Sequence, residues 1–491
     1  MPIPITGSML YGLVTCPHRV AQDLFANPAD RDPVSPFVEL LWERGIAHER
    51  ETIADLDVPF VDLSIYARDE KERRTAEAIA SGALLIYGGR ISADDLLGDP
   101  DLLRKENGGY VAGDIKSGAG EEGADDNRKP KTSYAVQIAL YTDILERKGW
   151  AASRKPFIWD VHGEEVVYDL DAPIGVKNPT TLWAEYQEYL AEARRIVSRA
   201  EPTTPAYSGP CKMCWWLSSC LKRLEQQDDL TLIPELGRSR RTALVSSFPN
   251  IAALGSADIN LFITGKKTVF SGIGPPTLTK FSDRAKLLKS QNPKPYVKNP
   301  ITFPVADTEI FFDIEVDPMR DVCYLHGFVE RRAGNGGLRY VPFFAEEPTP
   351  RAEKQAFAAA WDYLRGQPNA AIYYYSPYER TWWAALQRRH ADVCSATDVE
   401  AMFDERRVVD LYTDVVRPHT EWPTRDFSIK TLAKYLGFKW RDTHPSGAAS
   451  IEWFDRWVKT GDTEIRQRIL EYNEDDCCAT AVLLDGIRRL G

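Results

Sequence analysis

The sequence predicts an α/β protein built from several domains. Its 491 residues exceed what one hydrophobic core usually supports. Short apolar runs of strand length, such as residues 81–89, alternate with amphipathic runs of helical period, such as residues 133–149. We expect an N-terminal domain over 1–225, a helical basic connector over 226–304 and a C-terminal domain over 305–491.

Composition narrows the class of protein. The formal net charge of −11 argues against indiscriminate coating of nucleic acid, but it permits local basic channels beside acidic metal sites. No apolar run is long enough to span a bilayer, and the first residues do not combine a basic segment with a cleavable apolar one. We therefore expect a cytoplasmic protein without a membrane partner. Its eight cysteines are too few for a disulfide scaffold, so clustered cysteines are better explained as metal ligands.

Residues 98–118 carry the first candidate site. Alternate side chains of an extended chain share a face, so Asp114 and Lys116 project together while Ile115 turns into the core. With Asp101 on a neighbouring strand or turn, the two carboxylates form a divalent-metal site. Lys116 steadies the water or the charge that develops on phosphorus, which indicates phosphodiester hydrolysis. The alternative is an amphipathic hairpin with solvated charges.

Two predicted helices add polar side chains to this region. His48 lies in a helix over 38–56, and Gln137 and Tyr141 lie four residues apart on one face of the helix over 133–149. Two polar side chains placed one turn apart can contact one ligand.

The chain resembles the RecB-family nucleases of the PD-(D/E)xK superfamily. The resemblance is carried by four motifs in the family's order: G-x-x-H at 45–48, G-x-x-D at 98–101, D-x-K at 114–116 and Q-x-x-x-Y at 137–141. It implies a restriction-endonuclease-like fold for the N-terminal domain. It also implies that His48, Asp101 and Asp114 bind Mg²⁺ or Mn²⁺, that Lys116 is catalytic, and that Gln137 and Tyr141 position the strand being cut.

Four cysteines form a candidate staple for the same domain. Cys211, Cys214 and Cys220 follow a C-x2-C-x5-C spacing, and Cys16 supplies a fourth ligand if the two ends of the domain meet. Zn²⁺ suits a tetrahedral thiolate site well. One remote N-terminal cysteine with this spacing resembles the iron-sulfur staple of the AddB nucleases and of the CRISPR-associated iron-sulfur exonucleases, which implies a structural [4Fe-4S] cluster. We favour the cluster and keep Zn²⁺ as the alternative.

The connector combines a glycine-rich helix start with basic residues. Gly272 and Gly274 precede a predicted helix, so backbone N–H groups at its start are expected to meet a phosphate, with Lys280 on the same helix. The basic residues, with only Asp283 opposing, are Lys266, Lys267, Lys280, Arg284, Lys286, Lys289, Lys294 and Lys298. We expect either sequence-independent binding of a nucleic-acid backbone or a merely solvated basic connector.

An apolar strand over 308–318 opens the C-terminal domain, with Asp313 and Glu315 on one face. Tyr472 and Asp476 lie one turn apart in a predicted helix over 469–487. This domain resembles the DEDDy exonucleases of the ribonuclease H-like fold, most closely the YprB-like domains, through D-x-E and Y-x-x-x-D. The resemblance implies two divalent ions held by carboxylates, a tyrosine that orients the attacking water, and 3′ to 5′ polarity.

The second acid of the C-terminal motif set departs from the family pattern. The family usually has an Asp there, and this chain has Glu379. Asp410 is the alternative, and we expect it to be a supporting residue near the site.

Together these patterns predict a metal-dependent nuclease that hydrolyses nucleic acid, in particular single-stranded DNA ends, with two separate active sites. The chain has no G-x4-G-K-[ST] segment, so any unwinding requires a helicase partner, in repair or in defence. Two alternatives stay open. In the first, the chain is a nucleic-acid-binding scaffold or helicase partner with one or both nuclease sites inactive. In the second, it is an RNA exonuclease.

Overall fold

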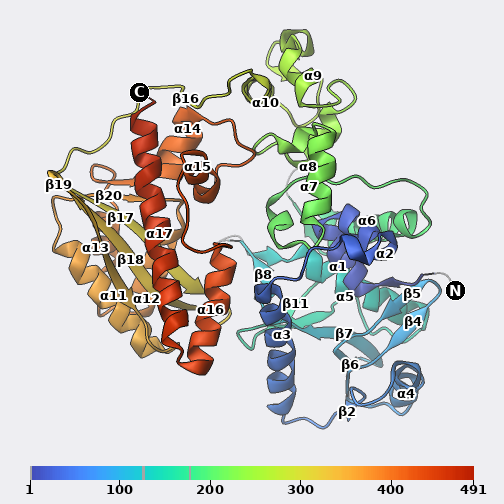
Figure 1. Cartoon of the computed structure of the whole chain (residues 1–491). Coiled ribbons are helices and arrows are strands. Elements are labelled where there is room, and N and C mark those ends of the chain that lie inside the picture. The colour runs from blue at the N-terminus through green and yellow to red at the C-terminus, as the bar shows by residue number, and fades with distance from the viewer. Residues whose placement is uncertain (1–2, 124–127, 176–178, 491) are drawn as a thin grey trace. The chain divides into compact units, whose positions relative to one another are not determined.

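The computed structural model describes residues 3–123, 128–175 and 179–490, which form two compact units (Figure 1). The N-terminal unit comprises Met1–Pro205 and Gly209–Leu221, and the C-terminal unit comprises Ala206–Ser208 and Lys222–Gly491. The segment predicted as a connector belongs to the C-terminal unit and has a hydrophobic core of its own. The predicted α/β class is confirmed in both units.

A six-stranded sheet lies at the centre of the N-terminal unit. Its strands run in the order β11 (Glu165–Val167), β10 (Phe157–Trp159), β7 (Gly109–Ile115), β6 (Leu102–Glu106), β3 (Leu85–Tyr87) and β2 (Val61–Asp62). A smaller sheet has the order β1 (Ile5–Thr6), β5 (Leu96–Gly98) and β4 (Ile91–Ala93). The helices are α1 (Gly7–Thr15), α2 (Pro17–Phe25), α3 (Pro36–Ala54), α4 (Arg68–Ala80), α5 (Thr132–Arg147), α6 (Leu182–Val197) and the start of α7 (Leu217–Gln226).

Alternation along β7 decides which of its side chains meet which helix. Tyr110 and Ala112 are buried in the core that contains α1, α5 and α6. Val111 and Ile115 are buried on the opposite face, against the C-terminal end of α3 and Phe60. Since Asp114 follows the alternation of Tyr110 and Ala112, it faces α5, as expected from the strand pattern.

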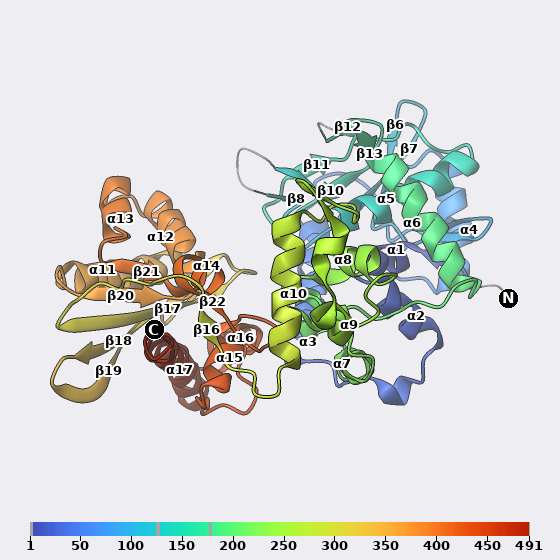
Figure 2. The ribbon, with the colours of Figure 1, turned by 90° about the horizontal axis from the view of Figure 1, so that it is seen from above.

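A five-stranded sheet forms the centre of the C-terminal unit. Its order is β19 (Asn335–Phe344), β18 (Val322–Arg332), β17 (Thr308–Asp317), β20 (Ala371–Tyr374) and β21 (Val408–Asp410). The first three strands are antiparallel, whereas β20 and β21 run parallel to β17. Figure 2 shows the sheet between two groups of helices. One group is α11 (Pro350–Arg365), α12 (Tyr378–Arg389) and α13 (Ala396–Met402), and the other is α15 (Ile429–Tyr435), α16 (Gly447–Thr460) and α17 (Thr463–Arg488).

Residues 226–304 fold into α8 (Gly237–Leu244), α9 (Ile251–Ser256), a hairpin of β14 (Ile263–Thr264) and β15 (Lys267–Thr268), and α10 (Pro275–Lys289). Their core contains Phe248, Phe270 and Phe281. A short strand, β16 (Tyr296–Val297), pairs with β22 (Thr420–Glu421), so the segment is tied to the rest of the C-terminal unit. No helix among the described residues is long and apolar enough to cross a membrane.

Candidate active sites

The first acid pair lies where β6 and β7 meet. Leu102 pairs with Gly113, which brings the preceding Asp101 opposite Asp114. The Asp101 N–H donates to Asp114 Oδ1 over 3.3 Å, and the Ile115 N–H donates to Asp101 Oδ2 over 2.8 Å. Burial and the nearby charge of Asp114 hold the pKa of Asp101 well above its usual range.

Lys116 joins this pair from the same strand face. Its Nζ lies 2.7 Å from Asp114 Oδ2, and the Asp114 side chain is only 1% exposed. Burial lowers the pKa of Lys116, but the charges of Asp114 and Asp101 outweigh it, so the net shift is upward and the ammonium stays charged. The alternative of a hairpin with solvated charges is therefore excluded by the burial of Asp114.

His48 approaches from α3, and its buried Nε2 has no hydrogen-bond partner among the described residues. A Cβ on Gly45 would lie 3.8 Å from Ser117 Oγ, which places this part of α3 beside the segment after β7. Asp114 Oδ2 is also buried, and its partner is the ammonium of Lys116. The imidazole nitrogen of His48 and the carboxylate of Asp114 are groups of the kind that bind divalent cations.

Gln137 and Tyr141 contact each other on α5. Gln137 Nε2 donates to the Tyr141 hydroxyl over 3.0 Å, and Tyr141 is buried. A Cβ on Gly98 would lie 2.6 Å from the Tyr141 ring, so the first glycine of the G-x-x-D motif makes room for this tyrosine. The G-x-x-D and Q-x-x-x-Y motifs are separate in the sequence, but they pack against each other beside Asp101.

The four candidate staple cysteines all lie in the N-terminal unit. Cys16 separates α1 from α2, Cys211 lies in the 3₁₀ helix Gly209–Met213, and Cys220 lies in α7. The Cys214 N–H donates to the Cys211 carbonyl over 3.1 Å, and burial raises the pKa of the Cys214 thiol.

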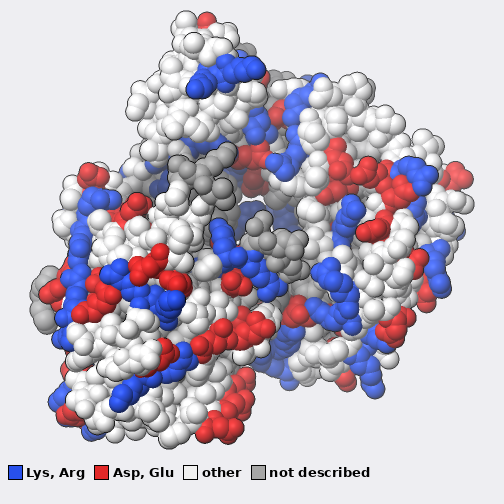
Figure 3. Space-filling model, turned by 180° about the vertical axis from the view of Figure 1, so that it is seen from behind, with Lys and Arg blue, Asp and Glu red and all other residues white. Residues whose placement is uncertain are grey.

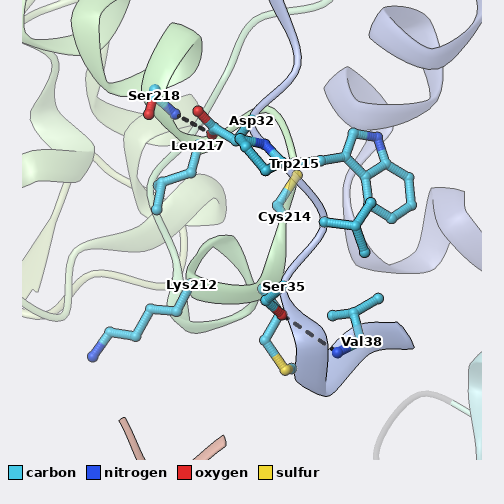
Figure 4. A pocket seen from close by; sticks show the side chains of 11 residues that line it. Asp32, Ser35, Val38, Lys212, Cys214, Trp215, Leu217 and Ser218 are labelled. Carbon is cyan, nitrogen blue, oxygen red and sulfur yellow. Dashed lines mark hydrogen bonds between the residues drawn. The ribbon is translucent and has the colours of Figure 1, made fainter. Parts of the chain in front are cut away.

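A network of hydrogen bonds ties the cysteine loop to the segment after Cys16. Asp23 Oδ1 accepts the indole N–H of both Trp215 and Trp216, each over 2.8 Å. The Asp32 N–H donates to the Trp215 carbonyl over 2.7 Å, and Asp32 Oδ2 accepts the Ser218 N–H over 2.9 Å. Figure 4 shows Cys214 beside Trp215 in the wall of a cavity of 220 Å³. The two ends of this domain therefore meet, which is the condition for Cys16 to complete the set.

The second acid cluster lies between β17 and α17. Asp313 and Glu315 are on the β17 face that α17 covers, and Asp476 projects from α17. Their ligand oxygens lie within 4.8 Å of one another, and they are the one such group of three or more metal-ligand side chains in the described ranges. Burial and the charge of Asp476 raise the pKa of Glu315 to about 8, and burial with the charge of Glu315 raises the pKa of Asp313. This concentration of buried acids favours binding of a cation.

Three further side chains donate hydrogen bonds to the acids of this cluster, and one of them also contacts Tyr472. Lys430 Nζ on α15 lies 2.7 Å from the Tyr472 hydroxyl and 3.0 Å from Asp476 Oδ2. The Trp440 indole N–H donates to Asp476 Oδ1 over 2.6 Å. Asn473 Nδ2 donates to Asp313 Oδ2 over 2.8 Å. Tyr472 and Asp476 thus share a face of α17, as predicted from their spacing.

Glu379 stands at the start of α12, and Asp410 positions the turn before it. Asp410 Oδ1 accepts the N–H groups of Ser376, Tyr412 and Thr413 over 2.9, 2.9 and 3.1 Å. Ser376 has φ of +99°, a strained value that this bond supports. Glu379 is buried, its Oε2 has no hydrogen-bond partner among the described residues, and burial raises its pKa. Glu379 lies outside the group that Asp313, Glu315 and Asp476 form within 4.8 Å, so its role as an acid of the site, with Asp410 as its support, stays a prediction.

Sequence reasoning missed Lys430, Trp440 and Asn473. Asn473 adjoins Tyr472 in the motif, so the sequence did contain a signal for it. Lys430 and Trp440 lie 46 and 36 residues before Asp476, and no short motif joins them to it.

The connector differs from the prediction in two ways. Pro275 and Pro276 occupy the first two positions of α10 and have no N–H groups, and the Thr277 N–H already bonds the Gly274 carbonyl. The helix start therefore offers fewer phosphate-binding groups than predicted, although Gly272 has the positive φ of a tight turn, +71°. The expected phosphate contacts of Gly272, Gly274 and Lys280 stay predictions.

Five of the eight basic residues of the connector are paired with acids, some within the connector and one, Glu421, outside it. Arg284 is 3% exposed and pairs with Glu421 over 2.9 Å and with Glu235 over 3.0 Å. The further pairs are Lys280–Glu235, Lys286–Asp283, Lys289–Asp228 and Lys298–Glu421. On the face shown in Figure 3, Lys and Arg are intermixed with Asp and Glu. The Lys286–Asp283 pair agrees with the expectation that Asp283 opposes the basic residues. The expectation that no other acid does so is wrong for the remaining four residues.

Family models match both units. Residues 15–221 match the PD-(D/E)XK nuclease superfamily, and residues 310–487 match the RNase_H superfamily. A search of curated proteins finds no match to this chain. The two matched segments contain the two acid clusters described above.

Proposed function

We propose that this chain, which joins a PD-(D/E)XK nuclease superfamily domain to an RNase_H superfamily domain, is a metal-dependent nuclease that degrades single-stranded DNA from its ends with two separate active sites. The observation that carries the proposal is the group formed by Asp313, Glu315 and Asp476, whose ligand atoms lie within 4.8 Å of one another. Domains of these families typically use divalent metals such as Mg²⁺ or Mn²⁺.

In the C-terminal site, the proposed ligands of the divalent ions are Asp313, Glu315 and Asp476, with Glu379 as a further acid. The ions would activate a water molecule and stabilise the leaving oxygen. Tyr472 orients that water through its hydroxyl, while Asn473 holds Asp313 in place. By resemblance to the DEDDy exonucleases, this site trims a strand from its 3′ end.

In the N-terminal site, Asp101, Asp114 and His48 are the proposed ligands. Lys116, which lies 2.7 Å from Asp114, contributes a fixed positive charge beside the scissile phosphate. Because that charge acts on the negative charge that develops during the reaction, Lys116 accelerates turnover more than it strengthens binding. Gln137 and Tyr141 support this site from α5.

Digestion of end-labelled strands tests the proposal. Single-stranded DNA with free or blocked 3′ and 5′ ends, and RNA of the same sequence, is incubated with Mg²⁺, with Mn²⁺ or with EDTA. We expect metal-dependent release of nucleotides from DNA, with loss of the 3′ trimming in Asp313→Ala and of the remaining products in Asp114→Ala. Faster digestion of RNA would establish the RNA exonuclease instead. Binding of strands without any cleavage would establish the scaffold, and it would refute the proposal.

We also propose that Cys16, Cys211, Cys214 and Cys220 hold a structural [4Fe-4S] cluster, supported by their common unit and by the contacts that tie the cysteine loop to α2. Protein purified without oxygen should then be brown and contain iron. Cys16→Ser should lose the iron and lower the melting temperature of the N-terminal unit, because metal binding energy in such sites is folding energy. A colourless protein with stoichiometric zinc would contradict the iron-sulfur cluster, although the four cysteines would still join the two ends of the domain.

We also propose a helicase as the partner of this chain, because it would supply the single strands.

A further inference from the structure

Lys430 places a positive charge inside the acid cluster of the C-terminal unit. Its Nζ lies 2.7 Å from the Tyr472 hydroxyl and 3.0 and 3.3 Å from the two carboxylate oxygens of Asp476. The side chain is 25% exposed, Ser428 caps the start of α15, and Leu432 and Ala433 of the same helix are fully buried. Lys430 therefore reaches the cluster from a helix that is packed into the core.

Asp476 has donors on both oxygens before any metal ion is considered. Trp440 Nε1 donates to Oδ1 over 2.6 Å, and the ammonium of Lys430 faces Oδ2. A divalent ion that uses Asp476 must share the carboxylate with these groups. The ammonium of Lys430 thus competes with a divalent ion for the Asp476 carboxylate. It also balances part of the negative charge of the acid cluster.

The bond to Tyr472 fixes the direction of a hydrogen. An ammonium group has donors and no acceptor, so the Tyr472 oxygen must accept from Lys430. The hydroxyl hydrogen of Tyr472 is then left for another acceptor. Lys430 thereby occupies an acceptor position of the Tyr472 oxygen and directs the hydroxyl hydrogen away from the ammonium.

We propose that Lys430 is a positioning residue of the RNase H-like site: its ammonium holds Asp476 and Tyr472 in their working orientation and competes with a divalent ion for Asp476. The inference rests on the proposed function of this site. It predicts two effects of opposite sign when the charge is removed. Divalent ions bind more tightly, because the competing cation is gone, whereas turnover falls, because Asp476 and Tyr472 are no longer held.

The test uses full-length protein with Asp114→Asn and Lys116→Ala, so that the N-terminal site does not contribute to cleavage. Mn²⁺ binding is titrated by electron paramagnetic resonance, and kcat and KM are measured on a 3′-labelled single strand. For Lys430→Met we expect Mn²⁺ affinity to rise about tenfold and kcat to fall about tenfold, with KM changed less than about twofold.

Two variants serve as controls, and a third repeats the test with a different neutral side chain. Lys430→Arg keeps the charge and should keep the Mn²⁺ affinity of the parent protein. Lys430→Gln removes the charge but keeps a donor, so it should bind Mn²⁺ as tightly as Lys430→Met, and it replaces that variant if Lys430→Met fails to fold. The exposed Lys439, nine residues away, should leave both Mn²⁺ affinity and kcat unchanged when replaced by Met.

A folded Lys430→Gln or Lys430→Met protein whose Mn²⁺ affinity is unchanged or weaker would overturn the inference. A structural role for Lys430 would weaken binding and turnover together, and it would not produce effects of opposite sign. An inactive parent protein would refute the proposed function of the C-terminal site. The Mn²⁺ titration would still decide the role of Lys430, because it does not depend on cleavage.

Discussion

The two acid sites of this chain contain the same kinds of group and assemble them in different ways. In the N-terminal unit, Asp114 and Lys116 lie two residues apart on β7, and their side chains meet over 2.7 Å. In the C-terminal unit, the ammonium that contacts Asp476 comes from Lys430, which is 46 residues away on a different helix. Strand alternation is sufficient to build the first pair, whereas the second exists only because α15 packs beside α17.

The two sites also differ in how far their ligands converge. Asp313, Glu315 and Asp476 already lie within 4.8 Å of one another, which is the only group of this kind that the described ranges contain. In the N-terminal unit, His48 Nε2 is buried without a hydrogen-bond partner among the described residues. The candidate ligand atoms of the C-terminal site are therefore already close together, whereas His48, Asp101 and Asp114 do not form such a group among the described residues.

The largest expected effect comes from disabling both sites. Asp114→Asn with Asp313→Asn should reduce cleavage of every labelled strand by about 10³-fold or more, since each change removes a metal ligand and keeps the size of the side chain. Each single variant should keep the product pattern of the other site on a sequencing gel. If the double variant cleaves as much as a single variant, the two sites are not the two sources of the nuclease activity.

The next largest effect is expected at Lys116, whose positive charge should contribute to turnover in the N-terminal site and not to metal binding. In an Asp313→Asn protein, Lys116→Ala should lower the remaining turnover by about 10²- to 10³-fold, because the lost ammonium acts on charge that develops in the transition state. Mn²⁺ binding measured by calorimetry should survive. Lys155→Ala, at a position 59% exposed, is the matched control and should behave as its parent. Loss of Mn²⁺ binding in Lys116→Ala would instead make Lys116 a residue of the metal site.

A smaller effect is expected at Tyr472. In an Asp114→Asn protein, Tyr472→Phe should reduce trimming from a free 3′ end by about tenfold, because it removes one hydroxyl and no metal ligand. The same assay should show a far larger loss for Asp313→Asn. Equal losses in the two variants would mean that the hydroxyl does more than orient a water molecule.

The smallest effect is on stability. The pKa of Glu315 is about 8 in the folded protein against an ordinary 4.5. Between these values the folded state keeps a proton that the unfolded chain has released, so the free energy of unfolding of the metal-free protein falls as pH rises from about 4.5 to about 8.

Thermal unfolding in EDTA at pH 6 and pH 8 checks this sign. The melting temperature of the C-terminal unit should be lower at pH 8, and Mn²⁺ should restore it, because the ion takes the place of the proton. Glu315→Gln should weaken the pH dependence. A melting temperature that rises between pH 6 and pH 8 in EDTA would contradict the raised pKa.

The sequence determined the features that depend on local geometry. Alternation along a strand put Asp114 with Lys116, and Asp313 with Glu315, because successive side chains of an extended chain point to opposite faces. Helical spacing likewise put Tyr472 on the same face of α17 as Asp476. The resemblances to the two nuclease superfamilies followed from motifs of this kind, and the family matches at 15–221 and 310–487 confirm them.

Only the tertiary structure decided which charges remain available. Arg284 looked like part of an unopposed basic surface, but it is buried against Glu235 and Glu421, which lie 49 and 137 residues away. Lys430 had no motif, yet it reaches Asp476 across a helix pair. Ion pairs between distant segments depend on which segments pack together, because packing brings the charged groups within reach of each other. No local periodicity of the chain records that packing.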